Sequence, residues 1–115
     1  MQNSVEALEK QKEGNLAAIK RRDQVIKLMK NADFRKLIME EFCVNECARY
    51  AQMSADPNLD ADARADCLGI AQAAGHLRRW FHVIEKMGNT AEDSMVALEQ
   101  ELDFARSGGE DETEE

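Results

Sequence analysis

A heptad repeat constrains the fold of this chain more than any other feature of its sequence. Between residues 61 and 87, small or apolar side chains recur at alternating steps of four and three residues: Ala63, Cys67, Ile70, Ala74, Leu77, Phe81 and Ile84. This spacing places them on one stripe of an α-helix, facing a neighbouring helix. Because Ala63, Cys67 and Ala74 are small, that neighbour can approach closely.

Signals at both ends of this repeat suggest where the helix starts and stops. The turn-rich stretch SADPNLDAD precedes it, and Asp60 is a suitable N-cap. At the other end, Gly88 is a typical C-cap residue, and Asn89 with Glu92 resembles a capping box. We therefore expect a tight helical hairpin at Gly88 and a fourth helix that packs back along the third. The fourth helix would use the following stripe: Ala91, Met95, Leu98, Leu102 and Ala105.

Two further helices are expected before residue 54. Asp33 is a good N-cap for a helix over about 34–53, and Pro57 opposes its continuation. Apolar residues lie on both sides of that helix, which predicts a central helix covered twice. A first helix should run from about residue 4 to residue 30, with a sparse apolar stripe in its first half, typical of an arm.

Composition supports a helical protein. The 115 residues include one proline and few aromatic side chains, and a third of the residues are charged. We predict an all-α fold: a four-helix bundle-like domain built from helical hairpins, with an N-terminal helical arm and a disordered acidic C-terminal tail. The expected parts are an arm (1–24), a helical core domain (25–106) and an acidic disordered tail (107–115).

The sequence also indicates in which cellular compartment to expect the protein. No apolar run reaches the length of a membrane span, and Met1 is not followed by a basic and then an apolar leader. Three cysteines are an odd number in a domain that does not need disulfides. We expect a cytoplasmic protein with reduced thiols and no membrane partner.

The sequence signals for catalysis and for metal binding are weak. His76 and His82 lie about 120° apart around a helix, so they cannot share a metal ion unaided. Cys43 and Cys47 share a helix face and Cys67 lies on the next helix, which leaves a metal or redox site as one hypothesis. Buried core cysteines are the favoured interpretation. Neighbouring carboxylates fit solvated helix faces, so we expect no enzyme activity, no cofactor, no metal and no small-molecule substrate.

A basic stretch is the first candidate binding region. Residues 20–36 contain seven basic and two acidic side chains, and these could contact nucleic-acid phosphates. The chain as a whole has a net charge of −8, and no nucleic-acid-binding motif surrounds the stretch. An acidic protein surface, the tail of a neighbouring copy, or an ordinary solvated face are the competing interpretations. The partner candidates here are Lys20, Arg21 and Arg22.

The segment AGHLRRWFHVIEKMG contains the second candidate. On a helix, Leu77, Phe81 and Ile84 belong to the heptad stripe. The residues that remain outside it form a mixed surface, which either seats the first helix or binds another chain. The candidate partner-binding residues on this surface are Arg79, Trp80, Val83 and Met87.

The chain resembles the small all-helical proteins found among the head and virion genes of tailed bacteriophages. The resemblance covers about residues 25–105, through VIKLMKNADFRKLIMEEFCVNECARYA, the DPNLDADAR loop, AAGHLRRWFHVIEKMGNTAED and the acidic end. It implies a non-enzymatic part that binds other virion or assembly proteins, in the host cytoplasm and in the virion. The residues themselves favour an oligomeric interaction protein that binds copies of itself or other proteins. A nucleic-acid-associated or regulatory protein that uses residues 20–36 is the alternative.

Overall fold

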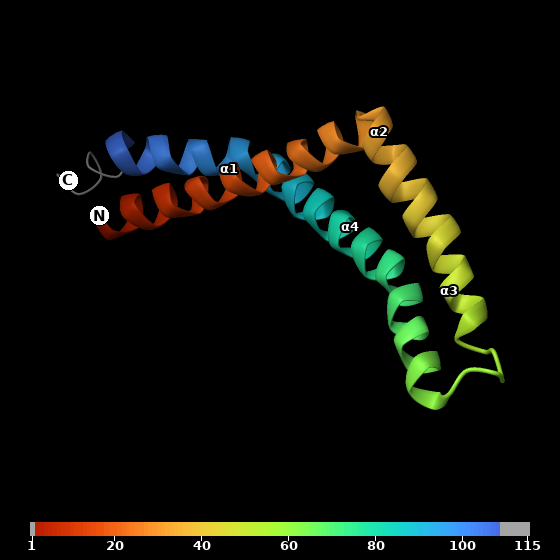
Figure 1. Ribbon diagram of the computed structural model, residues 1–115. Coiled ribbons are helices and arrows are strands. Elements are labelled where there is room, and N and C mark those ends of the chain that lie inside the picture. Colours follow the sequence, from red (N-terminus) through yellow and green to blue (C-terminus); the bar gives the residue numbers. More distant parts are fainter. Residues whose placement is uncertain (1, 109–115) are drawn as a thin grey trace. The chain divides into compact units, whose positions relative to one another are not determined.

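A computed structural model describes residues 2–108 of the chain, and those residues form helices without any strand. α1 spans Gln2–Lys30, and α4 spans Ala61–Asp103. Between them, α2 (Ala32–Phe34), the π-helix η1 (Arg35–Glu46) and α3 (Cys47–Met53) follow one another without a break. A short π-helix, η2 (Phe104–Gly108), follows α4. The all-α prediction is confirmed, because α1, the run from α2 to α3, and α4 make up three long helical segments in this part of the chain, which can be followed in Figure 1.

The predicted hairpin at Gly88 is wrong, and with it the fourth helix. α4 runs through Gly88, which has no positive φ and therefore does not form a left-handed C-cap. The physical reason lies in the repeat itself, since the step from Ile84 to Gly88 is four and the step from Gly88 to Ala91 is three. The two stripes that were assigned to two helices form one continuous stripe from Ala63 to Ala105.

Helix N-caps differ from expectation at two of three positions, because Asn89 lies inside α4 and therefore starts no helix. The side chain of Asn31, not Asp33, accepts a hydrogen bond from the backbone N–H of Phe34, at 2.9 Å. Asn31 has an extended backbone and so ends α1, while Asp33 lies in the first turn of α2. The Asp60 cap is confirmed, because its carboxylate accepts a hydrogen bond from the N–H of Ala63 at 2.7 Å.

The chain divides into two compact units. Unit 1 consists of Met1–Gln24 and Ile84–Glu115, of which residues 2–24 and 84–108 are described, and unit 2 is Val25–Val83. Residues 1–24, expected to form a separate arm, are therefore grouped with the second half of α4. Of the expected acidic tail, residues 107 and 108 belong to η2, and residues 109–115 lie outside the described part.

Unit 1 is an antiparallel pair of helices, with the first part of α1 beside the last part of α4 (Figure 1). Leu98 and Leu102 of α4 are buried in it. The facing stripe of α1 includes polar residues, and each has a partner on α4. The Nδ2 of Asn15 donates a hydrogen bond to the Oγ of Ser94 at 3.1 Å, and the ammonium of Lys12 lies 3.6 Å from the carboxylate of Glu99. These polar pairs are why the stripe of the first helix is sparse in apolar residues.

Unit 2 is a helical hairpin in which α2, η1 and α3 run antiparallel to the first half of α4, joined by residues 54–60. The rings of Phe34 and Phe81 lie 6.1 Å apart near its open end. Nearer the loop, the Sγ of Cys47 donates a hydrogen bond to the carbonyl of Ile70 at 3.5 Å. These two pairs fix the direction and register of the hairpin.

Candidate functional site: an apolar face on unit 2

The core of unit 2 is built from small side chains. Cys43, Cys47 and Ala74 form its buried cluster, with Met39, Phe42 and Leu77 packed against them. Small residues at the contact allow two helices to pack closely. They also bury little apolar area, so this core stabilises the hairpin less than Leu or Ile residues would.

Large apolar side chains of the same unit remain exposed to solvent. Each of the following is more than a third exposed: Ile26, Leu28, Leu37, Ile38, Val44, Leu68, Ile70, Trp80 and Val83. The expectation that the helix over 34–53 is covered on both sides is wrong for residues such as Leu37 and Val44, because only its Met39, Cys43 and Cys47 side faces α4. Unit 2 therefore has an apolar surface that its own two helical segments do not cover.

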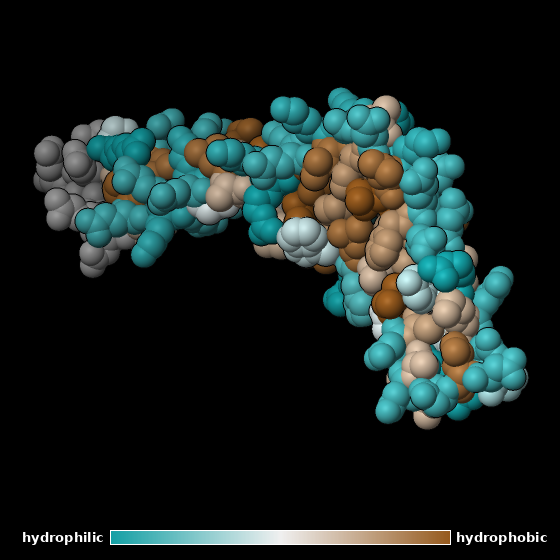
Figure 2. All heavy atoms as spheres, viewed as in Figure 1, coloured by the Kyte–Doolittle hydropathy of each residue, from teal (hydrophilic) through white to brown (hydrophobic). Residues whose placement is uncertain are grey.

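Part of this surface is an open groove along one side of the hairpin. Residues of η1 and α3 form one wall, and residues of α4 form the other: Phe42, Glu46, Tyr50, Ala65, Asp66, Gly69, Ile70 and Ala73. Figure 2 shows apolar side chains gathered where η1 lies beside the middle of α4. We call this side of the hairpin the apolar face. Because Gly69 and Ala73 are small, the α4 wall of the groove is low.

Trp80 extends the apolar face toward the open end of the hairpin. It lies seven residues after Ala73, or about two helical turns, and so on the same side of α4. Its ring stacks on Phe81 with a centroid distance of 5.8 Å, and it remains 54% exposed. Phe81 in turn contacts Phe34 of the opposite helix. Trp80 therefore packs against Phe81 and is otherwise largely exposed to solvent, which suits a residue that anchors a partner.

The structure separates the candidate residues of AGHLRRWFHVIEKMG. Trp80, Arg79 and Val83 are exposed residues of unit 2. Met87 belongs to unit 1, is 56% exposed, and lines a small pocket with Gly14, Ala17, Ala18, Arg21 and Ile84. Met87 therefore has different surroundings from Arg79, Trp80 and Val83, and it does not belong to the apolar face of unit 2.

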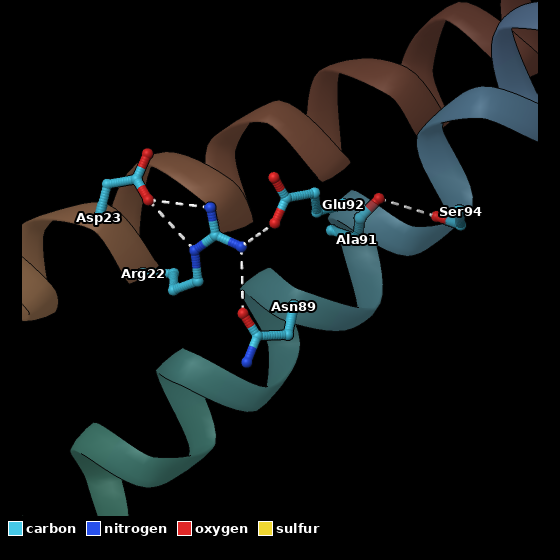
Figure 3. Close-up of polar contacts among 6 residues, drawn as sticks. All are labelled: Arg22, Asp23, Asn89, Ala91, Glu92 and Ser94. Atoms are coloured by element: carbon cyan, nitrogen blue, oxygen red, sulfur yellow. Dashed lines mark hydrogen bonds and ion pairs between the residues drawn. The ribbon is translucent and has the colours of Figure 1, made fainter.

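The basic candidates also differ from one another. Lys20 and Arg21 are exposed, whereas the Arg22 side chain is only 11% exposed. The Arg22 guanidinium donates hydrogen bonds to Glu92, to Asn89 at 3.0 Å and to Asp23 at 2.9 Å (Figure 3). The hydrogen bond to Glu92, followed by that to Asp23, raises the pKa of Arg22. The positive charge of Arg22 is therefore paired with carboxylates of unit 1.

The cysteines behave as core residues. Cys43, Cys47 and Cys67 are buried free thiols, and burial raises the pKa of Cys43 against a smaller opposing effect of Arg78. Within residues 2–108, no group of three His, Cys, Asp or Glu side chains could hold a metal ion. A raised pKa disfavours the nucleophilic thiolate.

Sequence reasoning missed the groove and the polar stripe of unit 1. The groove had a signal, because Asp66, Ala73 and Trp80 recur at intervals of seven next to the heptad stripe. The polar stripe had none, since Lys12, Asn15 and Arg22 are recognisable as contact residues only when their partners on α4 are known.

Comparisons with protein-family models, with curated proteins and with solved structures find no match to this chain. Separately, no helix in the described part of the chain combines the length and apolar character that crossing a membrane requires.

Proposed function

We propose that this protein is a non-enzymatic structural or assembly protein that acts through helix-mediated protein–protein contacts, with the apolar face of unit 2 as its contact surface. The size distribution of the apolar residues carries this proposal. Small residues such as Cys43 and Ala74 are buried, while Trp80 and Leu37 are exposed. Contiguous exposed apolar surface is uncommon on monomers and is typical of interaction sites. Tryptophan and arginine are frequent anchors in such sites.

More specifically, we propose a component of a bacteriophage virion or of head assembly, working in the host cytoplasm and in the particle. The resemblance of residues 25–105 to small helical head and virion proteins supports this, together with the helical fold. Its partners would be copies of itself, other virion proteins or assembly proteins.

The test is copurification of full-length protein from the cells in which it is produced, with variants of one exposed residue at a time. Trp80→Ala removes the anchor of the apolar face and should abolish capture of the specific partners. Leu68→Ala is the matched control, because Leu68 is an exposed apolar residue of α4 about 120° around the helix from Trp80. Capture that is equal for wild type and Trp80→Ala contradicts the assignment of the face. Purified particles that lack the protein contradict the virion proposal.

A nucleic-acid-associated or regulatory protein is the second candidate. Six of the seven basic residues in the stretch 20–36 are exposed, Arg22 being the exception. Phosphate contacts by these side chains would make binding weaken steeply as salt rises. Lys20→Ala with Arg21→Ala should then reduce affinity and the salt slope. Undetectable binding of DNA and RNA at low salt eliminates this candidate.

A further inference from the structure

The charges of unit 2 are segregated toward its two ends. Residues 25–83 carry eight basic and eight acidic side chains, so the unit has no net charge. The Phe34–Phe81 contact places the start of η1 beside residues 78–79 of α4, and the last turn of α1 directly precedes α2. This basic end has one acidic residue, Asp33, and the following basic ones: Lys27, Lys30, Arg35, Lys36, Arg78 and Arg79. Two further carboxylates, Glu40 and Glu41, lie on η1 between this end and the loop end.

The loop end of the same hairpin is acidic. Its five carboxylates come from α4, from the loop and from η1: Glu46, Asp56, Asp60, Asp62 and Asp66. Two arginines accompany them, and one of these, Arg49, forms an ion pair with Glu46 at 2.8 Å. Glu46 and Asp66 line the groove itself, so the acidic charge reaches the apolar face.

The shape of the apolar face also differs between the basic end and the acidic end of the hairpin. The bulky, exposed side chain of Trp80 lies toward the basic end. The open groove beside Gly69 and Ala73 lies toward the acidic end. One half of the apolar face therefore projects, and the other half is hollow.

We propose that the apolar face binds the same face of a second copy of this chain, in antiparallel orientation. A two-fold axis across the hairpin brings the basic end of each copy to the acidic end of the other, and faces Trp80 of each copy with the groove of the other. Such an interface is self-complementary, as closed dimers require. Opposite charges favour this orientation, whereas a parallel arrangement places like charges together. The inference rests on the proposed function, because it names the partner of the same surface.

The experiment is sedimentation velocity of the full-length chain under reducing conditions, from low to high micromolar concentration. The wild type should form a dimer that weakens as salt rises, because salt screens the attraction between the ends. Trp80→Ala should remain monomeric at concentrations where wild type dimerises, and Leu68→Ala should dimerise like wild type. Dimerisation that strengthens with salt contradicts the antiparallel orientation.

Charge reversal tests the orientation directly. Lys30→Glu, Lys36→Glu and Arg79→Glu together change the charge of the basic end from +5 to −1, and Glu46→Lys with Asp66→Lys changes that of the acidic end from −3 to +1. Each charge-reversed variant should be monomeric alone, while an equimolar mixture of the two should form a heterodimer. Melting temperatures and circular dichroism of each variant verify its fold, and all five substituted side chains lie at least partly at the surface. Recovery of association in the mixture cannot come from misfolded protein.

The outcomes separate this inference from the proposed function. A wild-type protein that stays monomeric at high micromolar concentration overturns the self-association, and so does a dimer that is unaffected by both Trp80→Ala and the charge reversals. If a different protein is then captured in a Trp80-dependent manner, the proposed function stands with another partner. If neither self-association nor Trp80-dependent capture is found, both fail.

Discussion

Arg22 of α1 lies directly over Gly88 of α4, so closely that a Cβ atom on residue 88 would overlap the Cβ of Arg22. It would also come within 3.0 Å of the carbonyl oxygen of Ala18. The glycine is therefore required for the close approach of two helices, and not for a turn. The Arg22 guanidinium extends from this contact to Asn89 and Glu92, so the crossing point is also held by hydrogen bonds.

Gly88→Ala should destabilise unit 1. Alanine favours a helix interior over glycine by roughly 1 kcal/mol, but overpacking a tight contact costs about 1–3 kcal/mol. The clash involves backbone as well as side chain, so we expect a net loss of about 1 kcal/mol in the free energy of unfolding, measured by urea denaturation.

Gly75→Ala is the matched control on the same helix, because a Cβ there meets nothing within 4 Å. It should raise the stability by roughly 0.5–1 kcal/mol through helix propensity alone. Equal effects of the two substitutions would falsify the close packing at Gly88.

The hydrogen bond between Asn15 and Ser94 should show coupling in a double-mutant cycle. Asn15→Ala leaves Ser94 with its second bond, to the carbonyl of Ala91, and Ser94→Ala leaves the half-buried Asn15 amide unpaired. We expect each single variant to lose about 0.5–1.5 kcal/mol of the free energy of unfolding. The coupling energy between the two substitutions should be of the same size, about 0.5–1.5 kcal/mol. Stability is read from urea unfolding of the two single variants, the double variant and wild type. Strictly additive losses would show that the two side chains do not interact.

The sequence predicted helix positions where a local signal existed. The heptad stripe from Ala63 to Ile84, the loop before Asp60 and the Asp60 cap all follow from short-range chemistry. The hairpin at Gly88 was wrong because a glycine followed by Asn and Glu has the same local sequence whether a helix ends there or is crossed closely by another. Only the unbroken 4–3 spacing through residue 88 distinguishes the two, and it is a longer-range pattern.

The candidate site was predictable only in part. Trp80, Arg79 and Val83 could be placed outside the heptad stripe by helix geometry alone. Whether anything covered them depended on where the first helix packs, and its polar contact residues gave no hydrophobic signal. The groove between η1 and α4 also depends on the π-helical hydrogen bonding of η1, visible where the N–H of Cys47 donates to the carbonyl of Phe42. A periodicity read as α-helical does not reveal that winding.

The N-cap at Asn31 should contribute to the stability of unit 2. Removing the side-chain acceptor with Asn31→Ala leaves the N–H of Phe34 without its capping bond and should cost about 0.5–2 kcal/mol. Asn31→Asp keeps an acceptor of the same length and should leave stability nearly unchanged. The measurement is thermal unfolding followed by circular dichroism. A loss as large for Asn31→Asp as for Asn31→Ala would argue against the cap.

Burial of Cys43 should make stability fall at alkaline pH. Burial raises the pKa of this thiol in the folded chain above its usual value of 9.0. The unfolded chain then releases the proton at lower pH than the folded chain does. The contribution of this thiol to the free energy of unfolding is therefore fully present below pH 9 and is lost as pH rises through the folded pKa. Other groups also titrate in this range, so the comparison is with Cys43→Ala, which has no thiol at this position. Between pH 7.5 and pH 10, wild type should lose more of its free energy of unfolding than Cys43→Ala loses. An identical loss in both proteins would mean that the Cys43 thiol ionises as easily in the folded chain as in the unfolded one.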